Sequence, residues 1–177
     1  LVRLAGDENA QDEIVAVLER LAGQAVKVLW TVTSDGTGIS DLESAGRKVS
    51  NWAKDVMSKP EYVVTNGKTY CLVVIRGDEF AADADRTTAN IRAEANRRRY
   101  LEPPAEVATL LRKKYIQKQL GFPYVVVMHK AITDSHGYPH LLVLFRCVYG
   151  EWLGAWDGNP GKQWYREDVF VFLAPQD

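Results

Sequence analysis

The sequence predicts an α+β domain, with a mainly antiparallel sheet of about five to six strands and about four helices packed on one face. Apolar residues make up 46% of the 177 residues and charged residues 25%, an ordinary globular composition that allows one compact domain over residues 1–177. The expected elements also include adjacent strands with no helix between them, which favours antiparallel hairpins over βαβ units. The longest apolar runs, 141–145 and 169–174, are far shorter than the roughly 20 residues of a membrane-spanning helix.

The first elements follow from apolar periodicity. Asp7, Glu8 and Asn9 precede an apolar stripe from Ile14 to Leu21, whose spacing of three and four predicts a helix that Gly23 can end. Alternation over residues 26–33 predicts a strand. Ser40 and Glu43 form a capping-box pattern, and the apolar positions from Leu42 to Val56 predict one continuous helix.

Residues 61–76 are expected to form a hairpin. Asn66-Gly67 lies between two strand-like runs, and this dipeptide accepts the positive φ angles of a two-residue type I′ turn. We therefore expect residues 61–65 to pair with residues 68–76.

The rest of the chain is expected to form two helices and then strands only. Residues 83–101 are helix-prone, and Pro103-Pro104 precedes a helix whose inward stripe contains Val107, Leu110, Leu111 and Tyr115. Hairpins over residues 124–173 are expected from strands at 124–133, 141–153 and 163–173, with turns at 134–139 and 157–162.

The cysteines and the amino-terminal residues indicate a cytoplasmic protein. Cys71 and Cys147 lie in apolar, strand-like contexts without CxxC spacing, which favours buried, reduced thiols, although a disulfide between them stays open. The apolar stretch at residues 1–4 is too short for a secretory signal, and acidic residues follow it at Asp7 and Glu8.

Basic residues are concentrated in one segment. Residues 86–118 contain nine of the 22 Lys and Arg residues and three Glu, a net charge of 9 − 3 = +6, in a chain of net charge −1. On a helix, Arg86 and Arg97 project together, as do Arg92 and Arg99, and Arg98 completes a run of three arginines. An anionic partner such as nucleic acid is one explanation, and a solvated helix face is the other.

Three histidines occur close together as His129, His136 and His140. If residues 134–139 form a hairpin loop, Thr133 opposes His140 and His129 opposes Leu144, which keeps His129 and His140 about 13 Å apart. They then do not share a metal ion. Asp134, His136 and His140 are weak candidates for an acid–base site around the loop, and a surface turn with incidental histidines is the alternative.

Two further patterns occur, a glycine-rich turn and a pair of tryptophans. Residues 35–40 contain a GxG sequence between a strand and a helix, but Asp41 stands where a dinucleotide fingerprint needs glycine, so a plain turn is favoured. Trp152 and Trp156 share one strand face near a turn, which predicts an aromatic edge for ligand contact or self-association.

These observations give one leading function and two alternatives. The leading hypothesis is a non-enzymatic binding or assembly domain whose basic segment 86–118 contacts an anionic partner. A second copy of the chain is a further candidate partner, which would make the protein a homo-oligomer. One alternative is a small metal-independent enzyme with its site at Asp134, His136 and His140. The other is a domain that binds a small ligand against aromatic side chains. No cofactor or metal is expected, and the residues alone do not decide whether the chain is an enzyme.

Overall fold

The computed structural model describes residue 14 and residues 26–176. The helix expected from Ile14 onwards lies outside the described residues, except for Ile14 itself. The strands are β1 (Trp30–Asp35), β2 (Lys48–Val49), β3 (Asn66–Arg76), β4 (Tyr124–Val127), β5 (Ile132–Thr133), β6 (Pro139–Cys147), β7 (Gly150–Asp157) and β8 (Val169–Leu173). The α-helices are α2 (Ile39–Ser44), α3 (Asn51–Met57), α4 (Thr88–Arg97), α5 (Glu106–Lys114) and α6 (Gln117–Leu120), with short 3-10 turns η1 (Gly77–Glu79) and η2 (Asp83–Asp85).

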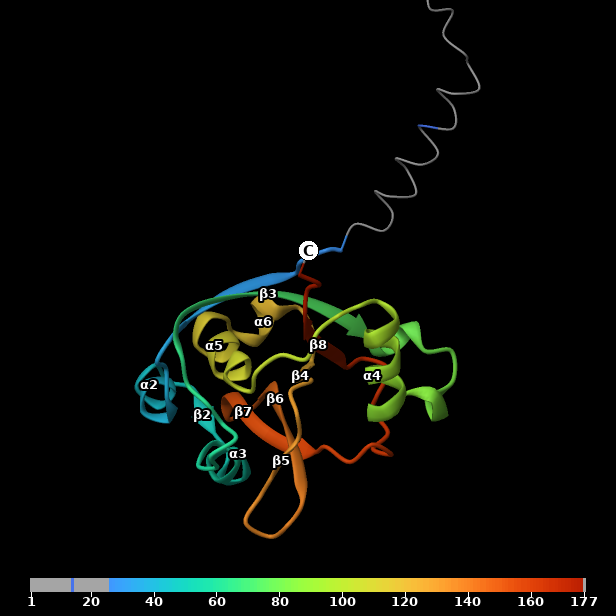
Figure 1. Ribbon diagram of the computed structural model, residues 1–177. Helices are drawn as coiled ribbons and strands as arrows, with labels where there is room; N and C mark the ends of the chain where they lie inside the picture. Colours follow the sequence, from blue (N-terminus) through green and yellow to red (C-terminus); the bar gives the residue numbers. More distant parts are fainter. Residues whose placement is uncertain (1–13, 15–25, 177) are drawn as a thin grey trace, which may run out of the picture.

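The strands form one mixed sheet that curls around α5 and α6 (Figure 1). The strand order is β1-β3-β8-β4-β6-β7-β2, and β5 pairs with β6 outside this path. The β2–β7 and β4–β8 pairs are parallel and the others are antiparallel. The α+β class is therefore confirmed, but the sheet has eight strands and is a mixed half-barrel.

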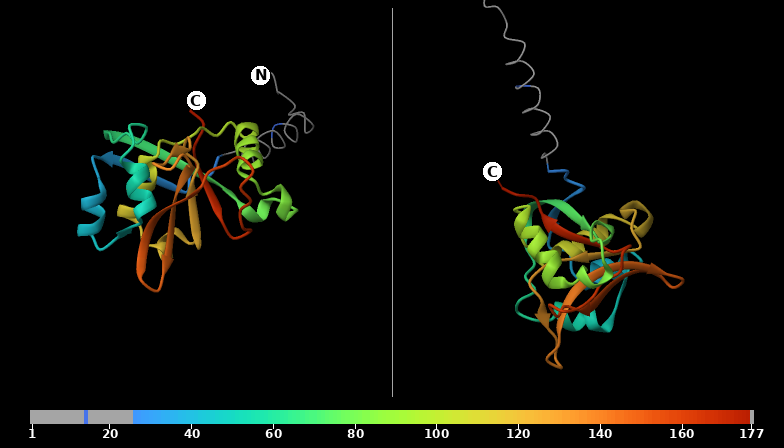
Figure 2. Two further views of the ribbon diagram at one scale, coloured as in Figure 1. Left: turned by 90° about the horizontal axis from the view of Figure 1, so that it is seen from below. Right: turned by 90° about the vertical axis from the view of Figure 1, so that its right-hand side faces the viewer.

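The sheet carries a core on each face, so the prediction that all helices pack on one face is wrong. The inner face packs against α2, α3, α5 and α6 through residues such as Leu42, Val56 and Leu111. The outer face packs against α4 through Ile91 and Ala95. Figure 2 shows α4 on the side of the sheet away from α2 and α3.

The hairpin predicted for residues 61–76 does not form. Only β3 is a strand, and it pairs with β1 and β8 instead. Gly67 has a φ of 79°, whereas Asn66 does not have a positive φ, so the turn is not type I′. Residues 61–65 are held by α5 instead, because the Thr65 N–H and hydroxyl donate to Glu106 at 2.7 and 2.6 Å.

The helix predicted from Leu42 to Val56 is divided in two. Gly46 has a φ of 74° just after α2, and β2 then pairs with β7 before α3 begins. Ser50 caps α3 by accepting the Ala53 N–H at 3.1 Å. The turn before α2 is the plain turn that was predicted, and Asp41 accepts the Gly38 N–H at 2.8 Å.

The carboxy-terminal strands also differ from the prediction. The strand expected at 141–153 contains a turn at Val148 and Tyr149, which separates β6 from β7. The strand expected at 163–173 is limited to β8, which inserts between β3 and β4 and does not pair with β7. The first difference is a local turn between adjacent strands, whereas the second arises because the partners of β8 are distant in the sequence.

The helix expected at 83–101 is shorter, since α4 covers only residues 88–97. The cysteines are free, and Cys71 is exposed rather than buried. None of the helices formed by residues 26–176 has the length and apolar character needed to span a bilayer.

Candidate functional site

Arg97, exposed in the last turn of α4, and Arg98, half-buried just after it, pair with carboxylates of this chain. Arg97 Nη2 lies 2.6 Å from Glu94 Oε1, and Arg98 Nη2 lies 2.5 Å from Glu79 Oε2. Arg99 is exposed and has a φ of 60° just beyond α4. Two arginines of the predicted run are therefore neutralised within the chain.

Two further arginines of the basic segment are not on an open surface. Arg92 is partly buried and donates to the backbone carbonyls of Met128 and His129 at 3.1 and 2.6 Å. Arg86 is 2% exposed. Binding of an anionic macromolecule along these helices stays a prediction, and the contacts within the chain do not favour it.

The predicted aromatic edge lies on the outer face of β7. Trp152 and Trp156 flank Gly154, and a Cβ on Gly154 would lie 2.8 Å from the ring of Phe145. Phe145 is parallel to Trp152 within 4° at a centroid distance of 6.3 Å, and Trp156 lies 6.2 Å from Trp164. Trp164 is buried and the other three rings are partly buried. Ligand binding or self-association through Trp152 and Trp156 stays a prediction.

His129 has the structural role expected from its apolar strand. It is 1% exposed, its Nδ1 donates to the Lys130 carbonyl at 2.7 Å, and its Nε2 accepts the Leu142 N–H at 2.9 Å. Burial lowers the pKa of His129 to about 4. The predicted pairing of His129 with Leu144 is wrong, because the imidazole of His129 bonds the backbone of Leu142, two residues earlier.

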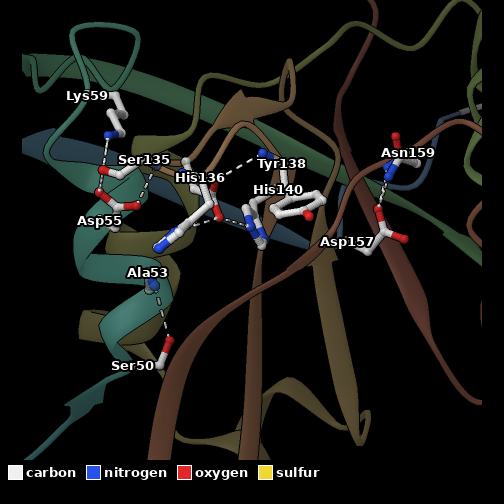
Figure 3. Close-up of polar contacts among 11 residues, drawn as sticks. Ser50, Ala53, Asp55, Lys59, Ser135, His136, Tyr138, His140, Asp157 and Asn159 are labelled. Carbon is white, nitrogen blue, oxygen red and sulfur yellow. Dashed lines mark hydrogen bonds and ion pairs between the residues drawn. The ribbon is translucent and has the colours of Figure 1, made fainter.

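Asp134 organises the histidine loop, which comprises residues 134–140. Figure 3 shows its hydrogen-bond partners His136, Tyr138 and His140. Its Oδ1 accepts the backbone N–H groups of His136 and Tyr138 at 2.8 and 2.9 Å, and its Oδ2 accepts Nε2 of His140 at 2.9 Å. The side chain of Asp134 has no exposed surface. Burial alone would raise the pKa of Asp134, but the hydrogen bonds from Tyr138, His140 and His136 outweigh burial and lower it.

The Asp134 carboxylate fixes the tautomer of His140. An ionised carboxylate can only accept hydrogen bonds, so Nε2 of His140 carries a proton. In the neutral ring, Nδ1 then has a free lone pair. Nδ1 of His140 is buried and has no hydrogen-bond partner among the described residues.

The strand register around the loop differs by one residue from the prediction. Ile132 of β5 pairs with His140 of β6, whereas Thr133 was expected there.

Trp52 of α3 packs against both imidazoles of the loop. Its ring centroid lies 5.6 Å from that of His140, with 27° between the planes, and 5.6 Å from that of His136. Trp52 is one of the apolar positions from Leu42 to Val56 that predicted a single helix, and in the structure it is 49% exposed. No pattern in the sequence connects it to residues 134–140, because that contact joins α3 to a distant loop.

The loop is anchored to α3 through Ser135. Its N–H and hydroxyl bond the two oxygens of Asp55 at 2.8 and 2.6 Å, and Lys59 Nζ lies 2.6 Å from the hydroxyl (Figure 3). In the described part of the chain, Asp55, Asp134 and His136 offer ligand atoms within 4.8 Å of one another. The Lys59 ammonium, 3.1 Å from Asp55 Oδ1, already supplies positive charge there, so this arrangement does not favour a metal ion.

A cavity of about 370 Å³ lies beside His140. It is bounded by α3, by the histidine loop and by the end of β7, where Asp157 Oδ1 accepts the Asn159 N–H at 2.8 Å. Its lining contains no Lys or Arg and consists of Trp52, Asp134, Tyr138, Pro139, His140, Asp157 and Asn159. The structure thus joins Asp134 and His140 to a cavity, whereas His136 is exposed with its Nδ1 4.0 Å from Asp134.

Comparison of the chain with protein-family models, with curated proteins and with solved structures found no match.

Proposed function

We propose that the chain is a small enzyme that uses Nδ1 of His140 as a general base, without a bound metal. The observation that carries this proposal is the Asp134–His140 pair. The carboxylate on Nε2 orients the ring and leaves the Nδ1 lone pair beside a cavity. A carboxylate in this position also stabilises the imidazolium that forms when the ring accepts a proton.

The cavity lining supports a neutral or cationic substrate. The carboxylates of Asp134 and Asp157 would repel an anionic substrate, and no Lys or Arg side chain lines the cavity to offset this repulsion. Trp52 offers a flat apolar surface, and Asn159 offers an amide for hydrogen bonding. A volume of about 370 Å³ lies near the lower end of the roughly 300 to 1,000 Å³ typical of small-molecule sites.

The reaction supported by these groups is proton removal from a bound hydroxyl, water molecule or acidic C–H group. The proton moves to Nδ1 of His140, and the resulting imidazolium is paired with Asp134. Nδ1 is buried and Trp52 stacks against the same ring, so we expect the substrate to reach Nδ1 when the Trp52 side chain turns. Trp52 lies at the surface of α3, where such rotamer changes take picoseconds to nanoseconds.

The tautomer of His140 provides the first test. A long-range ¹H–¹⁵N NMR spectrum near neutral pH should show Nε2 protonated and Nδ1 bare. The variant Asp134→Asn should disturb this preference, because an amide NH₂ can donate to Nε2. A protonated Nδ1 and bare Nε2 in the unmodified protein would contradict the proposal.

Turnover provides the second test. Nitrophenyl esters and small enolisable ketones are suitable probes of base-catalysed hydrolysis and proton abstraction. His140→Gln should lose the turnover, whereas His136→Gln is the matched control and should retain most of it, since His136 is exposed. Turnover that survives in His140→Gln would place the base elsewhere.

A further inference from the structure

A second cavity lies against Arg86, on the other side of the sheet from α3. The guanidinium donates from Nε to the Gly77 carbonyl at 2.8 Å and from Nη1 to the Trp164 carbonyl at 3.3 Å. The backbone carbonyl of Arg86 accepts the Trp164 N–H at 2.9 Å. Arg86 therefore connects the end of β3 to the segment between β7 and β8.

The position of the guanidinium is fixed by close backbone packing. A Cβ on Gly77 would lie 2.5 Å from the Tyr165 carbonyl oxygen and 2.8 Å from that of Arg166. Only glycine permits this approach, because no side chain fits at such distances. The Gly77 N–H also donates to the Asp168 carbonyl at 2.8 Å, which holds the segment in place.

The charge of Arg86 is poorly balanced within the chain. Among the described residues, the carboxylate within 4.0 Å of its guanidinium is that of Asp83, and the Asp83 side chain is 83% exposed. An exposed partner neutralises a buried charge only weakly, because water screens it. The hydrogen bonds formed within residues 26–176 use Nε and Nη1 and leave Nη2 free.

Asp168 lies nearby but does not complete the pair. It is fully buried, and its Oδ2 accepts the Tyr165 N–H at 2.9 Å. Its Oδ1 has no partner among the described residues, and it forms no ion pair with Arg86 within 4.0 Å. Burial raises the pKa of Asp168, which weakens its negative charge as a counterion.

The space in front of this guanidinium is larger than the His140 cavity. It has a volume of about 590 Å³. Gln163 and the exposed Arg166 supply further polar groups, while Asp83 and Glu167 place negative charge in the same lining. These two carboxylates would repel a polyanion such as nucleic acid. The volume of the cavity is sufficient for a small molecule.

We infer that this cavity binds a small molecule through one carboxylate or phosphate group, held by Arg86 and Arg166. Guanidinium groups suit these anions because their donors match the spacing of two oxygens. The anion would give Arg86 the counter-charge that a buried cation needs. The inference is independent of the base proposed at His140.

The test is an NMR titration of the ¹⁵N-labelled chain with sodium phosphate and, separately, with sodium acetate. Sodium chloride at matched ionic strength and pH is the reference. Saturable shifts should occur at the Arg86 Nε–H and at the backbone amides of residues 163–167. The arm with the larger response identifies phosphate or carboxylate as the preferred group. Shifts no larger than those with chloride, or equal shifts at Arg97, would overturn the inference.

A pair of surface variants separates specific binding from general charge. Arg166→Gln should weaken the binding of the preferred anion by about fivefold, since one charge-assisted hydrogen bond is lost. Arg97→Gln removes an exposed arginine outside the cavity and should leave the affinity unchanged. Equal affinities for Arg166→Gln and the unmodified chain, or an equal loss in both variants, would show that the cavity does not hold the anion as inferred.

Discussion

Asp134 and Arg86 are buried charges beside the two cavities, and the chain satisfies them in different ways. The Asp134 carboxylate accepts hydrogen bonds from residues two, four and six positions away. Arg86 donates to carbonyls nine and 78 positions away. A charge satisfied by its own loop organises that loop, whereas a charge satisfied by distant segments also fastens those segments together.

The difference extends to the atoms that remain free. At the histidine loop both oxygens of the buried carboxylate accept hydrogen bonds, and the buried atom without a partner among the described residues is Nδ1 of His140. At the other cavity the buried cation keeps a free donor. The first arrangement suits proton transfer and the second suits anion binding, and the following predictions test whether the two sites are separable.

Removing Arg86 should have the largest effect. Arg86→Met leaves the carbonyls of Gly77 and Trp164 without their donors, and we expect a loss of about 3 to 4 kcal/mol in the free energy of unfolding. Urea denaturation measures it. The control Arg97→Met removes an arginine whose side chain is 71% exposed and should change stability by less than about 0.5 kcal/mol. Equal denaturation midpoints for the two variants would contradict the role assigned to Arg86.

Acid should destabilise the fold through His129 before it affects the Asp134 loop. The pKa of His129 falls from 6.5 to about 4 on folding, so the unfolded chain binds more protons between these values. Stability should therefore fall by about 3 kcal/mol as the pH drops from 6.5 to 4. Asp134, whose pKa is lowered, contributes stability that is lost only below its usual value of 3.8.

Thermal denaturation at several pH values measures this loss. His129→Gln should flatten the dependence of the melting temperature on pH in that range, because Gln does not titrate and can still accept the Leu142 N–H. An unchanged slope in this variant would assign the acid sensitivity to other groups.

Asp134→Asn should act locally. The amide oxygen can still accept from the loop, but the amide nitrogen replaces the acceptor that faces His140. Hydrogen exchange at the backbone amides of His136 and Tyr138 should accelerate roughly tenfold, while exchange in β4 and β8 stays unchanged. Equal acceleration throughout the sheet would mean that this loop, like Arg86, supports the whole fold.

Ser135→Ala should have the smallest effect. Hydrogen bonds from Ser135, with the nearby Lys59, lower the pKa of Asp55 to about 2. Without the Ser135 hydroxyl the pKa of Asp55 should rise towards 3.8, and NMR titration of its carboxyl carbon measures the change. The tautomer of His140 should not change. A changed tautomer would show that α3 and the His140 site are coupled.

Local periodicity was sufficient for much of the secondary structure. Alternation over residues 26–33 indicated the strand that became β1, and the helix-prone stretch 83–101 contains α4. Closeness in the sequence grouped Asp134 with His136 and His140, and the contact between Asp134 and His140 spans only six positions. Each of these features depends on the direction of side chains within a few residues.

The tertiary structure decided which partners these elements have. Residues 61–65 carry a strand-like pattern, but Glu106 on α5 takes the Thr65 N–H that a hairpin would have used. The basic segment carries a charge pattern, but carbonyl acceptors from η1 and from the segment between β7 and β8 bind the Arg86 guanidinium. Trp52 reaches His140 only because α3 packs beside the loop. Sequence determines local conformation through short-range sterics and periodicity, whereas the pairing of buried polar groups depends on which distant atoms the fold brings within hydrogen-bonding distance.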